Sequence, residues 1–267
     1  PRRISVGAAR DFLLGVRFVD GRGTVIKNGG RVMKNVTGYD LVKLMAGSCG
    51  TLGVLTEVAM KVLPRPETEA TLVLHGLDDT GAVGAMARAL GSPFEVTGAA
   101  HDPEAARTML RIEGFETSVR YRLDQLRAVL TTTGAEMTVA HAEDSAEMWS
   151  KTRDVASFSA ADGGDVWRVS CKPSDGPAIA ARSGAEAWTY DWAGGLIWLK
   201  TPAGHDLRGR IGQIDGHATL VRADARTKAL LGTFHPETAG VARLTAGLRA
   251  QFDPRGIFAP RKTEQAA

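Results

Sequence analysis

The chain has 267 residues, a length that predicts one or two domains and a buried core. Hydrophobic residues make up 43% and charged residues 24%, which is typical of a globular protein and argues against a disordered chain. Lys and Arg number 33 against 30 Asp and Glu, with no basic block, so nucleic acid is not an expected partner.

Cysteine and apolar content narrow the class further. Cys49 and Cys171 lie far apart and lack the spacing of a metal site or a disulfide framework. No apolar run approaches the roughly 20 residues that span a bilayer, and no signal peptide is evident. We therefore expect no metal site, a cytoplasmic location, and contact with a membrane only through a partner.

The first 64 residues predict a small sheet with one helix. An apolar, β-prone run at 12–19, the turn signal Asp-Gly-Arg-Gly and a short strand at 24–26 together predict a hairpin. Apolar residues at helical spacing predict a helix over 39–46, and β-branched residues predict a strand over 54–63. Pro64 and Pro66 cannot continue that strand, so a domain boundary is expected after residue 64.

Residues 65–230 predict a duplicated domain. Each of two series has the β-α-β-β-α-β order of ferredoxin-like folds. The first series has strands at 71–74, 94–99, 108–112 and 136–140 and helices at 81–90 and 116–130. After a helix at 145–157, the second has strands at 165–171, 187–191, 196–200 and 218–222 and helices at 177–182 and 205–211. The expected fold class is α+β, with one antiparallel sheet of about eight strands and helices on one face.

The remaining residues, 231–267, are expected to form a separate C-terminal segment. Residues 230–238 have a turn-like composition. Val241, Leu244, Leu248 and Phe252 then recur at helical spacing and predict an amphipathic helix.

Four tryptophans lie in or beside the strands of the second series: Trp167, Trp188, Trp192 and Trp198. Large aromatic side chains favour half-buried positions on a pleated sheet. We expect these residues in the core of the sheet rather than in a binding site.

A glycine-dense turn is expected between the helix at 39–46 and the strand that follows. Gly47, Gly50 and Gly53 are three residues apart, with Ser48 and Thr51 between them. Glycine tolerates positive φ and has no Cβ, so successive backbone N–H groups can converge on an anion such as a phosphate. The alternative is a tight connection between helix and strand that binds nothing.

The run KNVTGYDLVKLMAGSCGTLGVLTEVAMKVLPRP around this turn resembles the flavin-binding, PCMH-type domain of the FAD-linked oxidase family, typified by vanillyl-alcohol oxidase. Within that family, the chain is most similar to the FAD-binding subunits of bacterial glycolate oxidases. Further blocks resemble these subunits in the same order, namely PRR, RDFLLGVRFVDGRG, WRVS with its following PSD, DWAGGLIWLK, GHAT and FDPRGIFAP.

The resemblance implies a domain order. Residues 1–64 would form the second, C-terminal lobe of a two-lobed FAD-binding domain, and residues 65–230 would form a cap domain over the flavin. The tail, 231–267, would return to the FAD-binding domain, with 257–260 against it. An N-terminal lobe carrying the first phosphate-binding loop is expected to precede this sequence.

The resemblance also implies the residues that bind the cofactor, which would be non-covalent FAD. One segment would place backbone groups against the pyrophosphate and adenosine, and it consists of Cys49, Gly50, Thr51, Leu52, Gly53, Val54 and Leu55. A second candidate segment is chosen from its side chains and contains Asn35, Thr37, Gly38 and Tyr39. Its amide, hydroxyl and phenol groups could hydrogen-bond the flavin ring edge or an anion, although Asn35 and Thr37 could equally stabilise a loop. The thiol of Cys49 is expected to fill space rather than to react.

His217 is the candidate catalytic residue, because imidazole titrates near neutral pH. The alternative is a hydrogen-bonded structural histidine at the start of a strand. FAD-linked 2-hydroxy-acid dehydrogenases carry a HxxHxGDGNxHP signature with metal ligands, and this chain has nothing like it. That departure puts direct substrate oxidation by this subunit in doubt.

The expected function is that of a subunit of a glycolate oxidase or dehydrogenase complex, which oxidises glycolate to glyoxylate in glyoxylate metabolism. The resemblance implies two partners, a second FAD-containing catalytic subunit and an iron–sulfur subunit, which could hold the protein at the periphery of the inner membrane. Two alternatives are a stand-alone FAD-dependent 2-hydroxy-acid dehydrogenase and a scaffold subunit without flavin. We expect residues 1–267 alone to be inactive and to retain FAD weakly.

Overall fold

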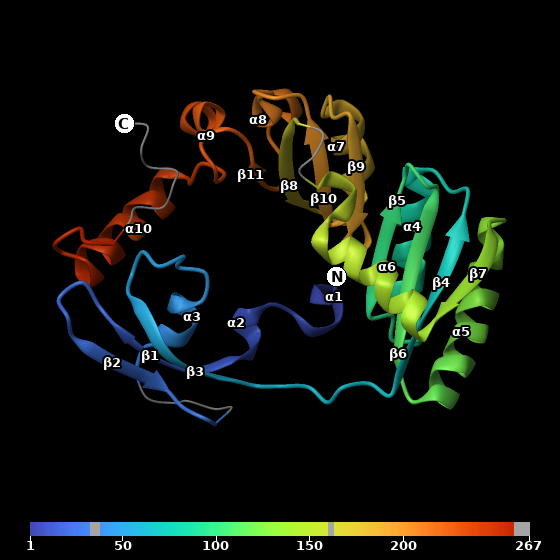
Figure 1. The fold of residues 1–267 in the computed structure, drawn as a ribbon, viewed down its shortest axis with the longest axis horizontal. Coiled ribbons are helices and arrows are strands. Elements are labelled where there is room, and N and C mark those ends of the chain that lie inside the picture. Colours follow the sequence, from blue (N-terminus) through green and yellow to red (C-terminus); the bar gives the residue numbers. More distant parts are fainter. Residues whose placement is uncertain (33–37, 160–162, 259–267) are drawn as a thin grey trace. The chain divides into compact units, whose positions relative to one another are not determined.

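The computed structural model describes residues 1–32, 38–159 and 163–258 (Figure 1). The chain divides into two compact units. The large unit comprises Pro1–Val6 and Arg65–His235, and the small unit comprises Gly7–Pro64 and Pro236–Ala267. The first six residues therefore lie with the large unit, whereas the sequence analysis assigned them to the domain of residues 1–64.

The small unit has a three-stranded antiparallel sheet in the order β2-β1-β3. Its strands are β1 (Leu13–Val19), β2 (Val25–Gly29) and β3 (Val54–Met60), and its helices are α2 (Ala9–Phe12), α3 (Leu41–Met45) and α10 (Ala239–Phe252). The carboxylate of Asp20 accepts hydrogen bonds from the backbone N–H groups of Arg22 (2.9 Å) and Thr24 (2.8 Å). These bonds fix the β1–β2 turn, as expected for an Asp-Gly hairpin.

The C-terminal helix packs on the core of the small unit. That core consists of Leu13, Val16, Phe18, Val42, Met45 and Leu52. The ring of Phe252 lies 6.0 Å from that of Phe18, and the N–H of Gly21 donates to the carbonyl of Phe252 at 2.7 Å. These contacts place the end of α10 beside the β1–β2 hairpin, although the two segments are more than 200 residues apart in the sequence.

The large unit contains an eight-stranded antiparallel sheet in the order β11-β8-β10-β9-β5-β6-β4-β7. Its strands are β4 (Thr68–His75), β5 (Gly98–Asp102), β6 (Arg107–Gly114), β7 (Glu136–His141), β8 (Asp165–Cys171), β9 (Ala187–Asp191), β10 (Leu196–Thr201) and β11 (Gly216–Arg222). Its helices are α1 (Arg3–Val6), α4 (Asp79–Leu90), α5 (Glu116–Leu130), α6 (Ala142–Asp154), α7 (Gly176–Arg182), α8 (Leu207–Ile211) and α9 (Ala225–Leu231).

Both halves of this sheet have the ferredoxin-like strand order. We call β4–β7 with α4 and α5 the first half, and β8–β11 with α7 and α8 the second half. Numbered within each half, the strands follow the order 4-1-3-2, and the two halves meet through their second strands, β5 and β9. The expected α+β class with an antiparallel sheet is thus confirmed.

Two details of the expected pattern are wrong. The strand expected at 94–99 lies at Gly98–Asp102, because Glu95 has φ +47° and interrupts an extended chain there. The second detail concerns α6. Helix α9 begins in residues for which the sequence analysis made no prediction, and Asp224 caps it by accepting from the N–H of Thr227 at 2.6 Å.

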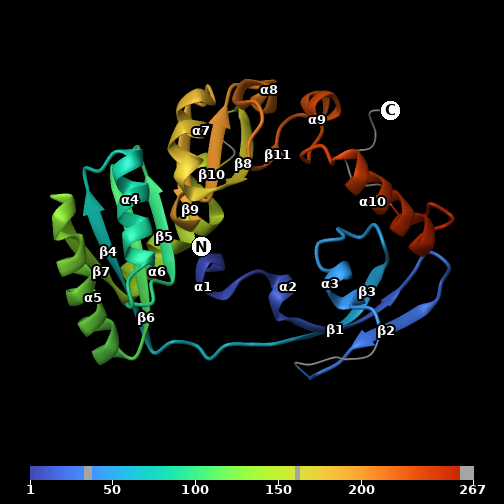
Figure 2. The ribbon, with the colours of Figure 1, turned by 180° about the vertical axis from the view of Figure 1, so that it is seen from behind.

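Helix α6 lies on the face of the sheet opposite to α4, as the two views in Figures 1 and 2 show. Alternate residues of β4 point to opposite faces: Leu72 enters the core with α4 and α5, whereas Thr71 accepts a hydrogen bond from Trp149 Nε1 of α6 at 2.7 Å. The helices therefore do not all occupy one face, contrary to the sequence-based expectation.

A polar cluster joins the two halves. β5 and β9 share a single backbone pair, His101 with Tyr190. One carboxylate oxygen of Asp79, in the first turn of α4, accepts hydrogen bonds from Tyr190 Oη (2.6 Å) and Trp188 Nε1 (2.8 Å). The other oxygen lies 3.5 Å from Nε2 of the buried His101.

Replacing Asp79 by alanine should destabilise the large unit by about 2–4 kcal/mol, since it leaves the buried Tyr190 Oη and the partly buried Trp188 Nε1 without this acceptor. The matched control is the neighbouring Asp78→Ala, which removes only the N-cap bond to Gly81 N (2.7 Å) and should cost about 1 kcal/mol. Urea unfolding of both variants measures the difference. Equal losses would show that the Asp79 cluster does not hold the halves together.

His101 should make stability depend on pH. Burial lowers the pKa of His101 below its ordinary value of 6.5. The unfolded chain then binds a proton that the folded chain resists, so stability should fall as the pH drops through 6.5. The His101→Gln variant should show a smaller loss between pH 7.5 and 5.5 in urea unfolding. An unchanged pH dependence would contradict the assignment to His101.

Candidate functional site

The turn between α3 and β3 has an open backbone. Gly47, Cys49 and Gly50 have φ values of +88°, +53° and +78°. The carbonyl of Ser48 accepts hydrogen bonds from both the N–H (3.1 Å) and Oγ1 (2.7 Å) of Thr51, which closes the turn. A Cβ at Gly47 or Gly50 would meet no atom of the described residues within 4 Å. The space beside these two glycines is therefore open to a ligand.

Gly53 has a different role. A Cβ at this position would lie 2.8 Å from the ring of Phe18 and 2.8 Å from the carbonyl oxygen of Val19. Close packing of the turn against β1 thus explains this glycine without a ligand. Of the three regularly spaced glycines, only Gly47 and Gly50 retain the open geometry that an anion requires.

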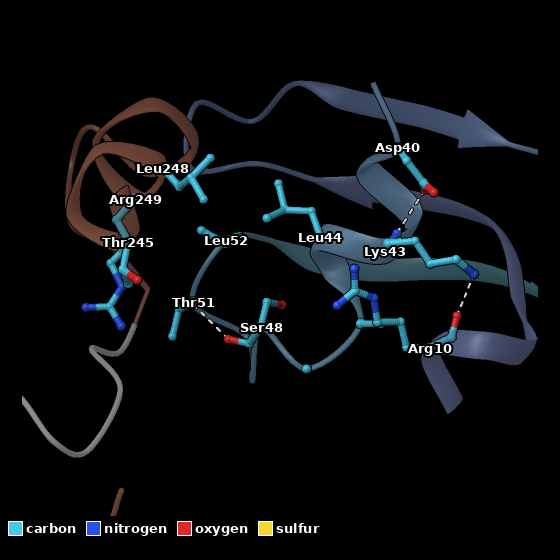
Figure 3. Close-up of a pocket in the computed structure, with 12 residues that line it drawn as sticks. Arg10, Asp40, Lys43, Leu44, Ser48, Thr51, Leu52, Thr245, Leu248 and Arg249 are labelled. Carbon is cyan, nitrogen blue, oxygen red and sulfur yellow. Dashed lines mark hydrogen bonds between the residues drawn. The ribbon is translucent and has the colours of Figure 1, made fainter. Parts of the chain in front are cut away.

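A cavity of about 510 Å³ adjoins the turn (Figure 3). Its volume lies within the range of about 300–1,000 Å³ that is typical of small-molecule sites. It is lined by Arg10, Asp40, Lys43, Leu44, Ala46, Gly47, Ser48, Thr51, Leu52, Thr245, Leu248 and Arg249. α10 thus contributes one wall. The resemblance implied that 231–267 returns to this domain, but no local pattern placed α10 beside the turn.

Positive charge predominates around this cavity. Among the residues that the structure describes, Arg10, Lys43 and Arg249 line it together with a single acidic residue, Asp40. The Lys43 ammonium donates to the carbonyls of Arg10 (2.5 Å) and Leu13 (2.9 Å), and Asp40 caps α3 by accepting from Lys43 N at 3.1 Å. The lysine is therefore fixed in place, and its charge favours an anionic ligand.

The predicted cofactor-binding residues are not all at the cavity. Thr51 and Leu52 are buried and line it. Cys49 is exposed, with its thiol donating to the carbonyl of Gly47 at 3.4 Å. Val54 and Leu55 are exposed on β3.

The second predicted segment is only partly described. Tyr39 is 88% exposed, and its carbonyl accepts a hydrogen bond from Asn28 Nδ2 at 3.1 Å. Gly38 has φ +78° and open space around it. Asn35 and Thr37 lie outside the described residues.

His217 lies on the second half of the large sheet, on the face opposite to α7 and α8. Its register partner on β8 is Ser170, and two residues along, Arg168 pairs with Thr219 on the same face. His217 reaches solvent and Arg168 is half-buried. Partial burial, then the charges of Arg168, His235 and Arg3, lower the pKa of His217. The imidazole is therefore held neutral at pH 7, next to a fixed positive charge.

Arg168 was not identified from the sequence, because a single arginine in a strand has the appearance of a solvated residue. Only the register of β8 with β11 shows that it shares a face with His217. Trp192 also differs from expectation: it lies in the β9–β10 turn, with the guanidinium groups of Arg3 and Arg168 each 5.1 Å from its ring.

Other potential chemistry is limited. Within the described ranges, no group of three or more His, Cys, Asp or Glu side chains is arranged to hold a metal ion. Burial raises the pKa of the Cys171 thiol to about 11, so this thiol is protonated at neutral pH. Among the helices of the described residues, none has the length and apolar character needed to cross a membrane.

Comparison with known proteins gives a consistent class. No family model matches the chain. It is 37% identical over 263 residues to glycolate oxidase subunit GlcE of Escherichia coli, spanning 97% of this chain and 67% of that protein. It is 44% identical over 72 residues to glycolate oxidase subunit GlcD of Bacillus subtilis, spanning 27% of this chain and 15% of that protein.

Solved structures share the fold. An alkyldihydroxyacetonephosphate synthase matches 97% of this chain and 56% of its own length, with a TM-score of 0.63 and 15% identity. A VAO-type flavoprotein from Myceliophthora thermophila matches 99% of this chain and 59% of its own length, with a TM-score of 0.60 and 12% identity. The chain thus spans little more than half of these proteins.

The relatives define the class of FAD-linked oxidoreductases, and the fold is shared with a VAO-type flavoprotein. The chain belongs to the family of glycolate oxidase subunit GlcE within this class. The family resemblance that the sequence motifs indicated is confirmed.

Proposed function

We propose that this chain is part of the FAD-binding subunit of a glycolate oxidase complex, which oxidises glycolate to glyoxylate. The observation that carries the proposal is the turn at 47–51. In this turn Gly47 and Gly50 have positive φ and open space around them, and Gly47, Ser48 and Thr51 line a basic cavity. The similarity to GlcE over nearly the whole chain supports this assignment.

The residues at the turn fit the pyrophosphate of FAD. Gly47 and Gly50 allow close approach of the backbone, and Arg10 and Lys43 supply positive charge. Thr51 is buried, and its bonds to Ser48 hold the turn in shape without occupying the open side. When bound, FAD would supply the two-electron acceptor for oxidation of a 2-hydroxy acid. A preceding lobe would complete the site, as the family resemblance implies.

The face that carries Arg168 and His217 favours direct binding of the substrate by this subunit. A guanidinium group matches the two oxygens of a carboxylate. A neutral imidazole nearby can accept the proton of a hydroxyl group, and the lowered pKa of His217 keeps it in that form. We propose that Arg168 holds the carboxylate of glycolate and that His217 accepts its hydroxyl proton.

Assembly with other subunits is also proposed. The relatives are named as subunits E and D of glycolate oxidase, and this supports a multi-subunit protein. The second subunit would contain a flavin of its own, and an iron–sulfur subunit would carry electrons onward. We propose a cytoplasmic location, at the inner membrane only through the complex.

One assay distinguishes this function from its alternatives. The full-length protein is reconstituted with FAD, and reduction of an artificial acceptor is measured with glycolate and D-lactate, with and without the partner subunits. Flavin binding with turnover only in the complex supports the proposal. Robust turnover by the protein alone would favour a stand-alone dehydrogenase, and a protein that binds no flavin would favour a scaffold.

A further inference from the structure

Arg168 has an unusual environment for a half-buried cation. Among the described residues, no partner forms a hydrogen bond or ion pair with the Arg168 side chain. Its guanidinium lies over the indole ring of Trp192, 5.1 Å from the ring centroid. Its five N–H donors are therefore available to an anion. Burial, and then the nearby Arg3, lower the pKa of Arg168, whereas the carboxylate of Asp191 raises it.

The turn that presents Trp192 is strained. Trp192 and Ala193 have φ values of +53° and +56°, and Gly194 has φ +99°. Two consecutive residues with a Cβ rarely adopt positive φ, and such strain persists only where the surroundings impose it. Strain of this kind is a reason to look for function at the turn.

Two sets of contacts impose this strained backbone, a hydrogen bond and close packing. The carboxylate of Asp191 accepts a hydrogen bond from the N–H of Trp192 at 2.7 Å. The methyl group of Ala193 is buried in the hydrophobic core of the first half, and a Cβ at Gly194 would lie 2.9 Å from the side chain of Val83 in α4. The β9–β10 turn is thus packed against the first half of the sheet, whereas Trp192 contacts Arg168 of the second half.

We propose that Trp192 is a positioning residue, whose indole ring pre-orders the guanidinium of Arg168 to bind the carboxylate of a small 2-hydroxy acid. This inference rests on the proposed function, in which Arg168 binds that carboxylate. An aromatic face attracts a guanidinium without accepting hydrogen bonds from its N–H donors, so the donors remain free. A carboxylate partner would instead occupy some of these donors. Arg3, at 5.1 Å from the same ring, adds a second positive charge.

The test measures binding of oxalate to the FAD-reconstituted full-length protein by titration calorimetry. Trp192→Leu should weaken binding about 10-fold, and Trp192→Phe, which keeps an aromatic face, about threefold. The matched control is Trp198→Leu: Trp198 is the register partner of Arg168 on β10, and no guanidinium lies over its ring among the described residues. It should bind oxalate within about twofold of the unchanged protein. Thermal unfolding verifies that each variant is folded.

The outcomes distinguish the role of Trp192 from the proposed function of Arg168 on which it rests. If Arg168→Gln leaves oxalate binding unchanged, the proposed carboxylate site is wrong. If Arg168→Gln removes binding but Trp192→Leu and Trp192→Phe bind as tightly as the unchanged protein, only the role of Trp192 is overturned. Equal losses in Trp192→Leu and Trp198→Leu would also overturn it. Should Trp192→Leu fail to fold, the comparison of Trp192→Phe with the unchanged protein decides the question.

Discussion

The Gly50→Val variant of the full-length protein should lose bound FAD, with the dissociation constant raised at least about 100-fold, or about 2.7 kcal/mol. Gly50 has φ +78°, and no atom of the residues that the structure covers lies near the position of a Cβ, so a valine side chain would occupy the space that a pyrophosphate approaches. The measurement is the flavin absorbance of the protein after gel filtration.

A matched control separates this effect from backbone strain. Gly23, in the β1–β2 turn of the same unit, has φ +84° and equally open space, but it lies outside the turn at 47–51, whose residues Gly47, Ser48 and Thr51 line the cavity. Both valine variants should lose about 1–2 kcal/mol of folding stability. Only Gly50→Val should lose flavin. If the two variants retain flavin equally, the turn is not part of the cofactor site.

The Arg168→Gln variant should lower kcat/KM for glycolate by about 10- to 100-fold, with most of the change in KM. The reason is the loss of a charge-assisted hydrogen bond to the substrate carboxylate, worth about 1.5–3 kcal/mol. The measurement is steady-state reduction of an artificial acceptor by the assembled complex.

Arg120→Gln serves as the control for the loss of one positive charge. Arg120 lies on α5, and within the described part of the chain it pairs only with Glu116, four residues away, at 2.9 Å on an exposed helix surface. Its replacement should leave kcat/KM unchanged. If both variants behave alike, the effect of Arg168 is one of overall charge, and the proposed carboxylate site is contradicted.

The repeated ferredoxin-like order could be predicted because the apolar periodicity of each element is local. The eight strands and the helices α4, α5, α7 and α8 follow from runs of five to fifteen residues. What could not be predicted depends on the sign of φ or on non-local packing. The positive φ of Glu95 (+47°) is the reason that β5 begins at Gly98 and not at the predicted residue 94. The placement of α6 depends on which face of β4 Trp149 packs against.

The candidate sites show the same limit. The glycine turn is contiguous in sequence, so its spacing alone identified it, although Gly53 is explained by contact with Phe18 and Val19 on another strand. Arg168 and His217 are 49 positions apart and share a face only through the register of β8 and β11. A local pattern carries no information on such pairs.

The central claim, that the turn at 47–51 and its basic cavity form part of an FAD site, is tested most directly by flavin stoichiometry. The full-length protein is purified, reconstituted with excess FAD, freed of unbound flavin and measured for bound FAD per chain. We expect one equivalent, released intact on denaturation because the attachment is non-covalent. A protein that remains colourless after reconstitution would contradict the account.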